Sequence, residues 1–303
     1  MNAHVSAIAS TVRPASLADR AMVLTVNISA WSARRHDKGI TNEVNSSHGA
    51  AADAGRYNKA LLHKDAMAAI QSVVSETRTG FLERTLPWLN DGSRIIANDG
   101  YLAFATWFNG QVSKFDSAVN DFLADYPRHV ADARIRLNGM FRDADYPTVA
   151  ELRGKFGMAV SVMPVPDASD FRVDMSEEQA ARIRADIERT VTDATTAAVR
   201  DIYARIADVT ARMVERLNAY KPGKPGQRAE GTFKDSLVNN VRELVDLLPA
   251  LNITGDPALS AMAQKLRPIT AHDAQELRDS ATVRESVKAE AEAILEHVND
   301  FLA

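Results

Sequence analysis

The residues best suited to bind a ligand follow a strand-like segment near the start of the chain. In LTVNISAWSARRHD, residues 24–37, apolar and polar side chains alternate before Trp31, and basic side chains follow it. An aromatic ring can stack on an unpaired base while neighbouring arginines hold phosphate groups. A second group of basic residues occurs in KPGKPGQR, residues 221–228. The residues of this predicted nucleic-acid site are Trp31, Arg34, Arg35, Lys38, Lys221, Lys224 and Arg228.

The same segment has a purely structural interpretation, in which Trp31 packs the end of the strand onto a helix and the arginines are solvated. Residues 1–60 contain seven Lys or Arg and four Asp or Glu, a local net charge of +3. The whole chain of 303 residues nevertheless carries a net charge of −4, so it has no general basic field. Both interpretations remain open at this stage.

A second candidate site is the acidic run DASDFRVD, in which Asp167, Asp170 and Asp174 lie close together in sequence. Clustered carboxylates are the ligands that Mg²⁺ prefers. Short acidic side chains also suit turns and helix caps, where they accept hydrogen bonds from backbone N–H groups. The run therefore indicates either a metal site in an enzyme or a structured turn.

No established catalytic pattern appears elsewhere in the sequence. The chain has no cysteine, and its seven histidines are scattered. It contains no phosphate-binding loop, dinucleotide fingerprint, HExxH zinc motif or GxSxG nucleophile elbow. The phrase DYP occurs twice, at 125–127 and 145–147, which suggests a tyrosine pair in an active site or, more simply, two helix boundaries marked by proline. We therefore expect a protein without a cofactor that is not an enzyme.

The absence of long apolar runs bears on where the protein acts. Nowhere do 18 apolar residues follow one another, and the N-terminus lacks the charged start and apolar run of a secretory signal. We expect a protein of the cytoplasm that does not enter a membrane.

Helical periodicity dominates the elements that must position these residues. An aromatic and aliphatic stripe predicts a helix over 99–126, and the two DYP phrases predict a further helix over 127–142. A helix is also expected over 57–84, and a loop over the Gly-, Ala- and Ser-rich residues 39–55. Residues 22–31 and two short strands within 158–174 predict a small antiparallel sheet.

The longest predicted element covers residues 177–220. Ser176 followed by Gln179 matches a capping box, and neither Pro nor Gly interrupts the segment. A helix of this length spans about 65 Å, more than the diameter of a compact domain. Its eight acidic residues balance seven arginines, which indicates a solvated face. The apolar stripe predicts helical partners, including another copy of the chain.

These elements predict a mainly α (α+β) protein: an elongated helical bundle with one very long helix and a small antiparallel β element. The linear organisation that we expect is a flexible N-terminus (1–20), a helical body (21–220), a linker (221–231) and a C-terminal helical part (232–303) packed on the body. Within the last part, Asp256-Pro257 predicts the start of one helix and Thr270 the cap of the next.

Several short phrases resemble a family of uncharacterised proteins carried by tailed phages and plasmids. The phrases are LTVNISAWSARR, RTLPW, DYP, MPVPDASDFRVD and FKDSLVNNVRELVDLLPALNITGDP, in that order, over about 22–260. The family has no established activity, so no functional residues carry over. Genes for AAA+ ATPases near some relatives imply an accessory role. The loop at 39–55 departs from the usual opening of the family.

Three functions follow from these patterns. The first is a non-enzymatic assembly or adaptor protein that binds itself or a protein such as an AAA+ ATPase. The second is a single-stranded nucleic-acid-binding protein that uses the residues after Trp31. The third is an enzyme with Mg²⁺ at the Asp167 run.

Overall fold

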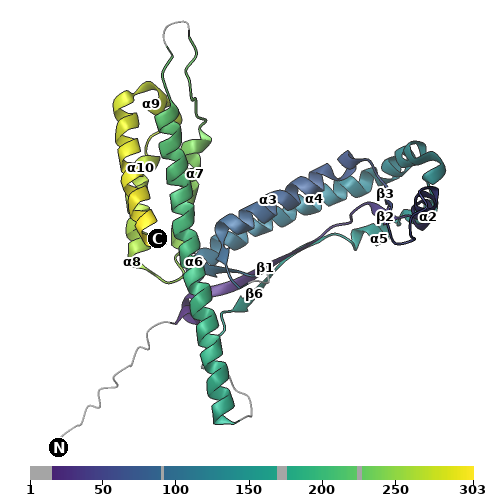
Figure 1. Cartoon of the computed structure of the whole chain (residues 1–303), viewed down its shortest axis with the longest axis horizontal. Helices are drawn as coiled ribbons and strands as arrows, with labels where there is room; N and C mark the ends of the chain where they lie inside the picture. The colour runs from purple at the N-terminus through teal and green to yellow at the C-terminus, as the bar shows by residue number, and fades with distance from the viewer. Residues whose placement is uncertain (1–15, 90–91, 169–175, 224–226) are drawn as a thin grey trace, which may run out of the picture. The chain divides into compact units, whose positions relative to one another are not determined.

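The protein is mainly α-helical, with a small antiparallel sheet, as the sequence predicts (Figure 1). The computed structural model describes residues 16–89, 92–168, 176–223 and 227–303. The helices are α1 (Leu17–Arg20), α2 (Lys38–Ser47), α3 (Ala68–Arg84), α4 (Asn98–Leu137), α5 (Val149–Arg153), α6 (Glu177–Ala219), α7 (Ser236–Leu251), α8 (Pro257–Thr270), α9 (Ala274–Asp279) and α10 (Ala281–Leu302). The strands are β1 (Ala21–Ser29), β2 (Arg34–His36), β3 (Asn58–Ala60), β4 (Leu86–Pro87), β5 (Arg94–Ala97) and β6 (Gly157–Pro164). Within the described ranges, none of the helices has the length and apolarity that crossing a membrane requires.

The chain forms two compact units rather than the linear series of parts expected from the sequence. Unit 1 contains residues 1–24, 84–101 and 162–303, and unit 2 contains residues 25–83 and 102–161. The C-terminal helices therefore belong to the same unit as the long helix. Residues 1–15 of the predicted flexible N-terminus lie outside the described residues, and 17–20 form the short helix α1.

Unit 1 is organised around the C-terminal part of α6, which packs beside α7 and α10 (Figure 1). Its core includes Ala198, Ile202 and Ile206 of α6, all fully buried, together with apolar side chains of α7, α8 and α10. The start of α4 approaches α7 very closely. A Cβ added at Gly100 would lie 2.4 Å from the Cβ of Ala250, so only glycine fits there.

The main sheet has the strand order β4-β5-β1-β6. Strand β5 is antiparallel to both neighbours, with Ala21 opposite Ala97 and Leu86 opposite Ile95. Alternation of apolar side chains correctly predicted β1 and the strand that begins near residue 158. The second strand expected within 158–174 falls partly on residues 169–175, which lie outside the described residues.

Unit 2 is built on α3 and α4, which lie side by side (Figure 1). Its core contains the α4 stripe predicted from the sequence, including Phe115, Val119 and Phe122. Ile28 at the end of β1 and Met158 in β6 pack against this core. The hydrophobic pattern thus correctly located both the helix and its buried face.

The expected loop at 39–55 is wrong over its first half, because residues 38–47 form α2. The Asp37 side chain caps this helix by accepting a hydrogen bond from the backbone N–H of Ile40 at 3.2 Å. Its buried face carries Thr41 and Asn45, whose polar groups bond backbone atoms. The sequence shows no apolar helical period here because polar side chains, rather than apolar ones, form the buried face of this helix.

The helix expected over 57–84 begins later, at Ala68. Residues 58–60 instead form β3, paired with β2, and a 3-10 turn (Lys64–Met67) precedes the helix. The apolar spacing that suggested the helix starts only at Met67, so it did not require helical structure before that residue.

The predicted helix boundary at the first DYP phrase is also wrong, since α4 continues through Pro127 to Leu137. Proline in a helix interior removes one hydrogen bond and disfavours a helical residue before it. Packing compensates here, because the ring of Tyr126 is buried against Trp31 and Phe122. At the second phrase a helix does start nearby: Thr148 caps α5 through the N–H of Glu151.

The long helix is confirmed as α6, and Ser176 caps it by accepting from the N–H of Gln179 at 3.4 Å. Asp256 caps α8, with Pro257 in its first turn, as expected. Thr270, in contrast, is the last residue of α8, and Asp273 and Ser280 cap the two helices that follow. In the predicted linker, Lys221 and Glu230 form an isolated antiparallel bridge.

Candidate functional sites

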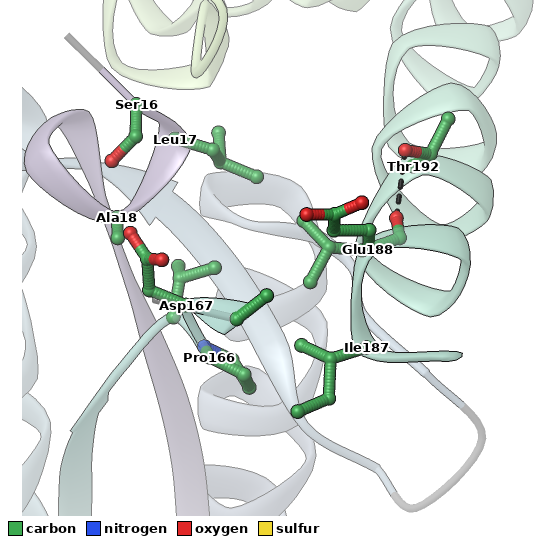
Figure 2. Close-up of a pocket in the computed structure, with 11 residues that line it drawn as sticks. Ser16, Leu17, Ala18, Pro166, Asp167, Ile187, Glu188 and Thr192 are labelled. Atoms are coloured by element: carbon green, nitrogen blue, oxygen red, sulfur yellow. Dashed lines mark hydrogen bonds between the residues drawn. The ribbon is translucent and has the colours of Figure 1, made fainter. Parts of the chain in front are cut away.

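One candidate site is a hollow of about 260 Å³ in unit 1, between α1, the residues after β6 and the N-terminal half of α6 (Figure 2). Two carboxylates, those of Asp167 and Glu188, line it together with the apolar side chains of Leu17, Ile187 and Val191. The Thr192 hydroxyl lies at the same wall, where it donates to the carbonyl of Glu188 at 2.8 Å. The lining of this hollow therefore combines apolar side chains with two acidic groups.

The predicted Mg²⁺ site can be placed only in part. Asp167 lines the hollow of Figure 2, whereas Asp170 and Asp174 lie outside the described residues. Among the described residues, no three His, Cys, Asp or Glu side chains are grouped so that they could hold a metal ion. The structure thus places Glu188 of α6 in the lining of the same hollow as Asp167, which the spacing of the acidic run did not suggest.

A second hollow, of about 490 Å³, lies in unit 2 between the start of α3 and the middle of α4. It brings together His63 and His129, which are far apart in sequence. His63 Nδ1 lies 3.2 Å from a carboxylate oxygen of Asp65, and His129 stacks on Phe122. Both rings therefore already have partners within the protein.

The third and most highly organised site surrounds the antiparallel strand pair β2–β3 of unit 2. The two strands are connected through α2, and we call this pair the β2–β3 hairpin. In this antiparallel pair Arg34 lies opposite Ala60 and Arg35 lies opposite Lys59. Because successive side chains of a strand point to opposite faces, Arg35 and Lys59 share one face and Arg34 lies on the other. The hairpin thus presents basic side chains on both faces.

Lys59 is the centre of a buried ion-pair cluster on this hairpin. Its side chain is 1% exposed, and its ammonium group lies 3.1 Å from Asp37 Oδ2 and 2.6 Å from Asp145 Oδ2. The ammonium group also donates a hydrogen bond of 2.7 Å to the backbone carbonyl of Met140. These three contacts equal the three N–H donors of lysine in number. The cluster ties the hairpin to the turn that follows α4.

Hydrogen bonds also set the protonation of one carboxylate in this cluster. The N–H of Ile40 and the ammonium group of Lys59 both donate to Asp37 and lower the pKa of this carboxyl below 3.8. Asp37 therefore stays ionised well into acid and serves as helix cap and counterion at the same time.

Arginines from three separate segments meet around the cluster. Arg35 contacts Asp145 Oδ1 at 3.2 Å and donates to the carbonyl of Ala144 at 3.1 Å. Arg136, at the end of α4, donates to the carbonyl of Ala60 at 2.7 Å. Arg142 lies 4.0 Å from Asp37 Oδ1. All of these guanidinium groups remain largely exposed, which leaves N–H donors available to a ligand.

Trp31, the predicted stacking residue, is occupied by the core of unit 2. Its ring centroid lies 6.4 Å from that of Phe122 and 6.0 Å from that of Tyr126, in tilted and edge-on contacts. The side chain is half-buried. This arrangement is the structural alternative left open by the sequence, and it reduces the surface that Trp31 could offer to a base.

The remaining residues of the predicted nucleic-acid site divide between the two units. Arg34 and Lys38 are exposed in unit 2, and Lys38 is the first residue of α2. Lys221 and Arg228 are exposed in unit 1, where Lys221 Nζ lies 3.5 Å from Glu230. Lys224 lies outside the described residues. Arg34, Arg35 and Lys38 therefore lie in one unit, and Lys221 and Arg228 lie in the other.

The two DYP tyrosines both lie in unit 2, and burial raises the pKa of each. That of Tyr126 is raised to about 12, and its hydroxyl has no hydrogen-bond partner among the described residues. The pKa of Tyr146 is also raised, and its hydroxyl donates to the carbonyl of Leu61 at 2.9 Å. Both hydroxyls thus stay protonated at neutral pH, the opposite of what a catalytic base or nucleophile needs.

Sequence reasoning missed Lys59, Asp37 and Asp145, and it also missed Arg136 and Arg142. A lone Lys or Asp within a polar stretch carries no signal of burial, since such residues are normally exposed. The only hint was Asp145 in the repeated DYP phrase. The contacts are long-range, so spacing along the chain could not reveal them.

No protein-family model matches this chain, and neither a curated protein nor a solved structure shows significant similarity to it.

Proposed function

We propose that the protein is a non-enzymatic assembly or adaptor protein that acts through helical protein–protein contacts. The observation that supports this proposal is the unequal covering of α6. Nine of its residues are buried; eight of them lie between Ala194 and Leu217, within the helical packing of unit 1. In the N-terminal part, residues 177–193, Ala180 is the one buried residue.

The apolar stripe nevertheless continues through this N-terminal part. Ile183, Ile187 and Val191 stand at helical spacing and are each only partly buried. Residues 177–193 extend about 25 Å at 1.5 Å per residue. An apolar face of this length on a helix is typical of helix-to-helix association. We propose a second copy of the chain as the first partner to test.

The resemblance to phage and plasmid proteins extends this proposal to a role in a mobile element, in the cytoplasm, as an accessory to an AAA+ ATPase or to DNA metabolism. An accessory role needs no catalytic residues of its own. It agrees with the two buried tyrosines, whose pKa values are raised, and with the balanced charge along α6.

Light scattering after size exclusion tests the proposal directly. We expect a mass that is a multiple of 33.1 kDa, the mass of one chain. The double variant Ile183→Glu/Ile187→Glu should reduce it to one chain. The matched control Ala181→Glu/Ala185→Glu adds the same charge at the same spacing on the opposite, exposed face of α6 and should leave the assembly intact.

A mass of one chain at every concentration would contradict self-assembly. Equal disruption by both double variants would also contradict it, because added charge rather than the apolar stripe would then be responsible.

A further inference from the structure

We propose that the exposed face around the β2–β3 hairpin binds the phosphate backbone of a nucleic acid. This binding site lies in unit 2 and goes beyond the assembly function, which rests on α6 of unit 1. We call the set of Arg35, Arg136 and Arg142 the arginine surface; Arg34 lies on the other face of the strand pair and does not belong to it.

The local charge differs sharply from that of the chain. The hairpin and the end of α4 comprise residues 31–38, 56–60 and 134–145, which contain eight Lys or Arg and three Asp, a net charge of +5. The intervening residues 39–55 add Glu43 and Asp53, which lowers it to +3. The whole chain carries −4, so the positive charge is concentrated here. Such concentration on an acidic chain is the electrostatic footprint of a polyanion site.

The buried cluster explains why this charge is not neutralised from within. The carboxylates of Asp37 and Asp145 both contact Lys59, and the same two carboxylates are the counterions of Arg35 and Arg142. Three cations therefore share two anions. Arg136 bonds a neutral carbonyl. An external anion can compensate the excess.

Several of these guanidinium groups are already held in place. Arg35 and Arg136 are tethered to the carbonyls of Ala144 and Ala60, and each retains further N–H donors on an exposed side chain. A tethered arginine loses less side-chain entropy when it binds phosphate, and its planar fork matches two phosphate oxygens. The separate positions of these arginines therefore favour a ligand with several phosphate groups, which they can contact at the same time.

The expected ligand is the backbone rather than the bases. Trp31 is half-buried and contacts Phe122 and Tyr126, which reduces the aromatic surface that it could offer for base stacking. Recognition of phosphates alone is independent of sequence and strongly dependent on salt. Anionic membrane lipids also carry phosphate, but proteins usually reach them with one basic amphipathic helix. The arginine surface instead combines a strand hairpin, the end of a helix and a turn.

The test is fluorescence anisotropy of the full chain with labelled oligonucleotides of about 30 nucleotides: single-stranded DNA, single-stranded RNA and duplex DNA. The variant Arg136→Ala removes one charge without unpairing any described carboxylate. We expect weaker binding and, for single strands, a slope of log K against log salt that is shallower by about 0.7, the value for one lost phosphate contact. The three ligands show which backbone is preferred.

Two further variants make the result specific. Arg182→Ala removes the same charge from an exposed position on α6 and should bind like the unchanged chain. Arg136→Lys keeps the charge and should restore the salt slope. Far-ultraviolet circular dichroism confirms that each variant is folded.

The proposal is overturned if none of the oligonucleotides binds at about 50 mM salt, a condition that favours phosphate contacts. It is equally overturned if Arg136→Ala and the α6 control have the same affinity. Binding to vesicles of phosphatidylserine in the absence of any oligonucleotide binding would assign the arginine surface to a membrane instead.

Discussion

Lys59 Nζ lies 2.6 Å from Oδ2 of Asp145, and both side chains are almost wholly buried although they come from distant parts of the chain. The same ammonium group also lies 3.1 Å from Oδ2 of Asp37. Burying a charge is costly unless it is paired and hydrogen-bonded. The cluster meets that condition, so it fixes the hairpin to the turn after α4 and thereby positions the arginine surface.

Lys59→Met should strongly destabilise the protein. Removing one partner of a buried ion pair leaves uncompensated charge and typically costs about 3–5 kcal/mol. Urea unfolding followed by circular dichroism gives the change in the free energy of unfolding. Lys114→Met is the control, because Lys114 and its partner Glu76 are both about half exposed; exposed pairs contribute only about 0–1 kcal/mol. Similar losses for both variants would show that the Lys59 cluster is not structural.

Acid should weaken the fold partly through Asp37. Its pKa is lower in the folded protein than the ordinary value of 3.8, chiefly because the N–H of Ile40 and Lys59 donate to the ionised form. A lowered pKa stabilises the folded state above the unfolded value, and this contribution is lost as the pH falls through the folded pKa. Asp37→Asn should therefore show a smaller loss of stability below about pH 4. Urea unfolding between pH 2 and 6 measures the difference, and an unchanged acid slope would contradict the assignment.

Tyr126→Phe should leave the stability unchanged or raise it. The hydroxyl is buried and has no partner among the described residues, so removing it deletes a desolvation cost rather than a hydrogen bond. Tyr126→Ala should cost about 3–5 kcal/mol, because it also removes a ring packed against Trp31 and Phe122. Thermal unfolding separates the two variants. A clear destabilisation by Tyr126→Phe would indicate that the hydroxyl does have a bonding partner.

Tyr126 also offers a direct check of its environment. Burial raises its pKa to about 12, so one tyrosine should ionise well above the ordinary value of 10.0. Ultraviolet titration of the unchanged chain and of Tyr126→Phe gives the difference spectrum of this residue. Ionisation near the ordinary value would contradict the burial.

Gly100 and Gly110 should respond oppositely to alanine although both lie in α4. In a helix interior alanine is favoured over glycine by about 1 kcal/mol. At Gly110 nothing lies within 4 Å of an added Cβ, so Gly110→Ala should stabilise the protein. At Gly100 the added Cβ would lie 2.4 Å from that of Ala250, and overpacking of this kind costs about 1–3 kcal/mol. Urea unfolding of the two variants gives the sign of each change, and equal signs would contradict the close approach of α4 and α7.

The sequence alone determined the long helices α4 and α6 and which of their faces are buried. The aromatic stripe of α4 and the uninterrupted period of α6 are local features, because a helix places residues three and four apart on one face. Alternation likewise located β1 and β6. Helix caps formed by residues within three positions of each other, such as Ser176 with Gln179 and Asp256 with Pro257, were predictable for the same reason.

Only the tertiary structure decided the rest. Pro127 lies inside α4 because distant packing of Tyr126 outweighs a local preference, and α2 forms because buried polar bonds replace a hydrophobic period. Asp145 contacts both Lys59 and Arg35, although it lies far from them in sequence. Arg142 and Arg136 likewise contact residues of remote segments. Such contacts depend on how the chain closes in space, and that closure is set by the sum of many weak packing interactions rather than by any local pattern.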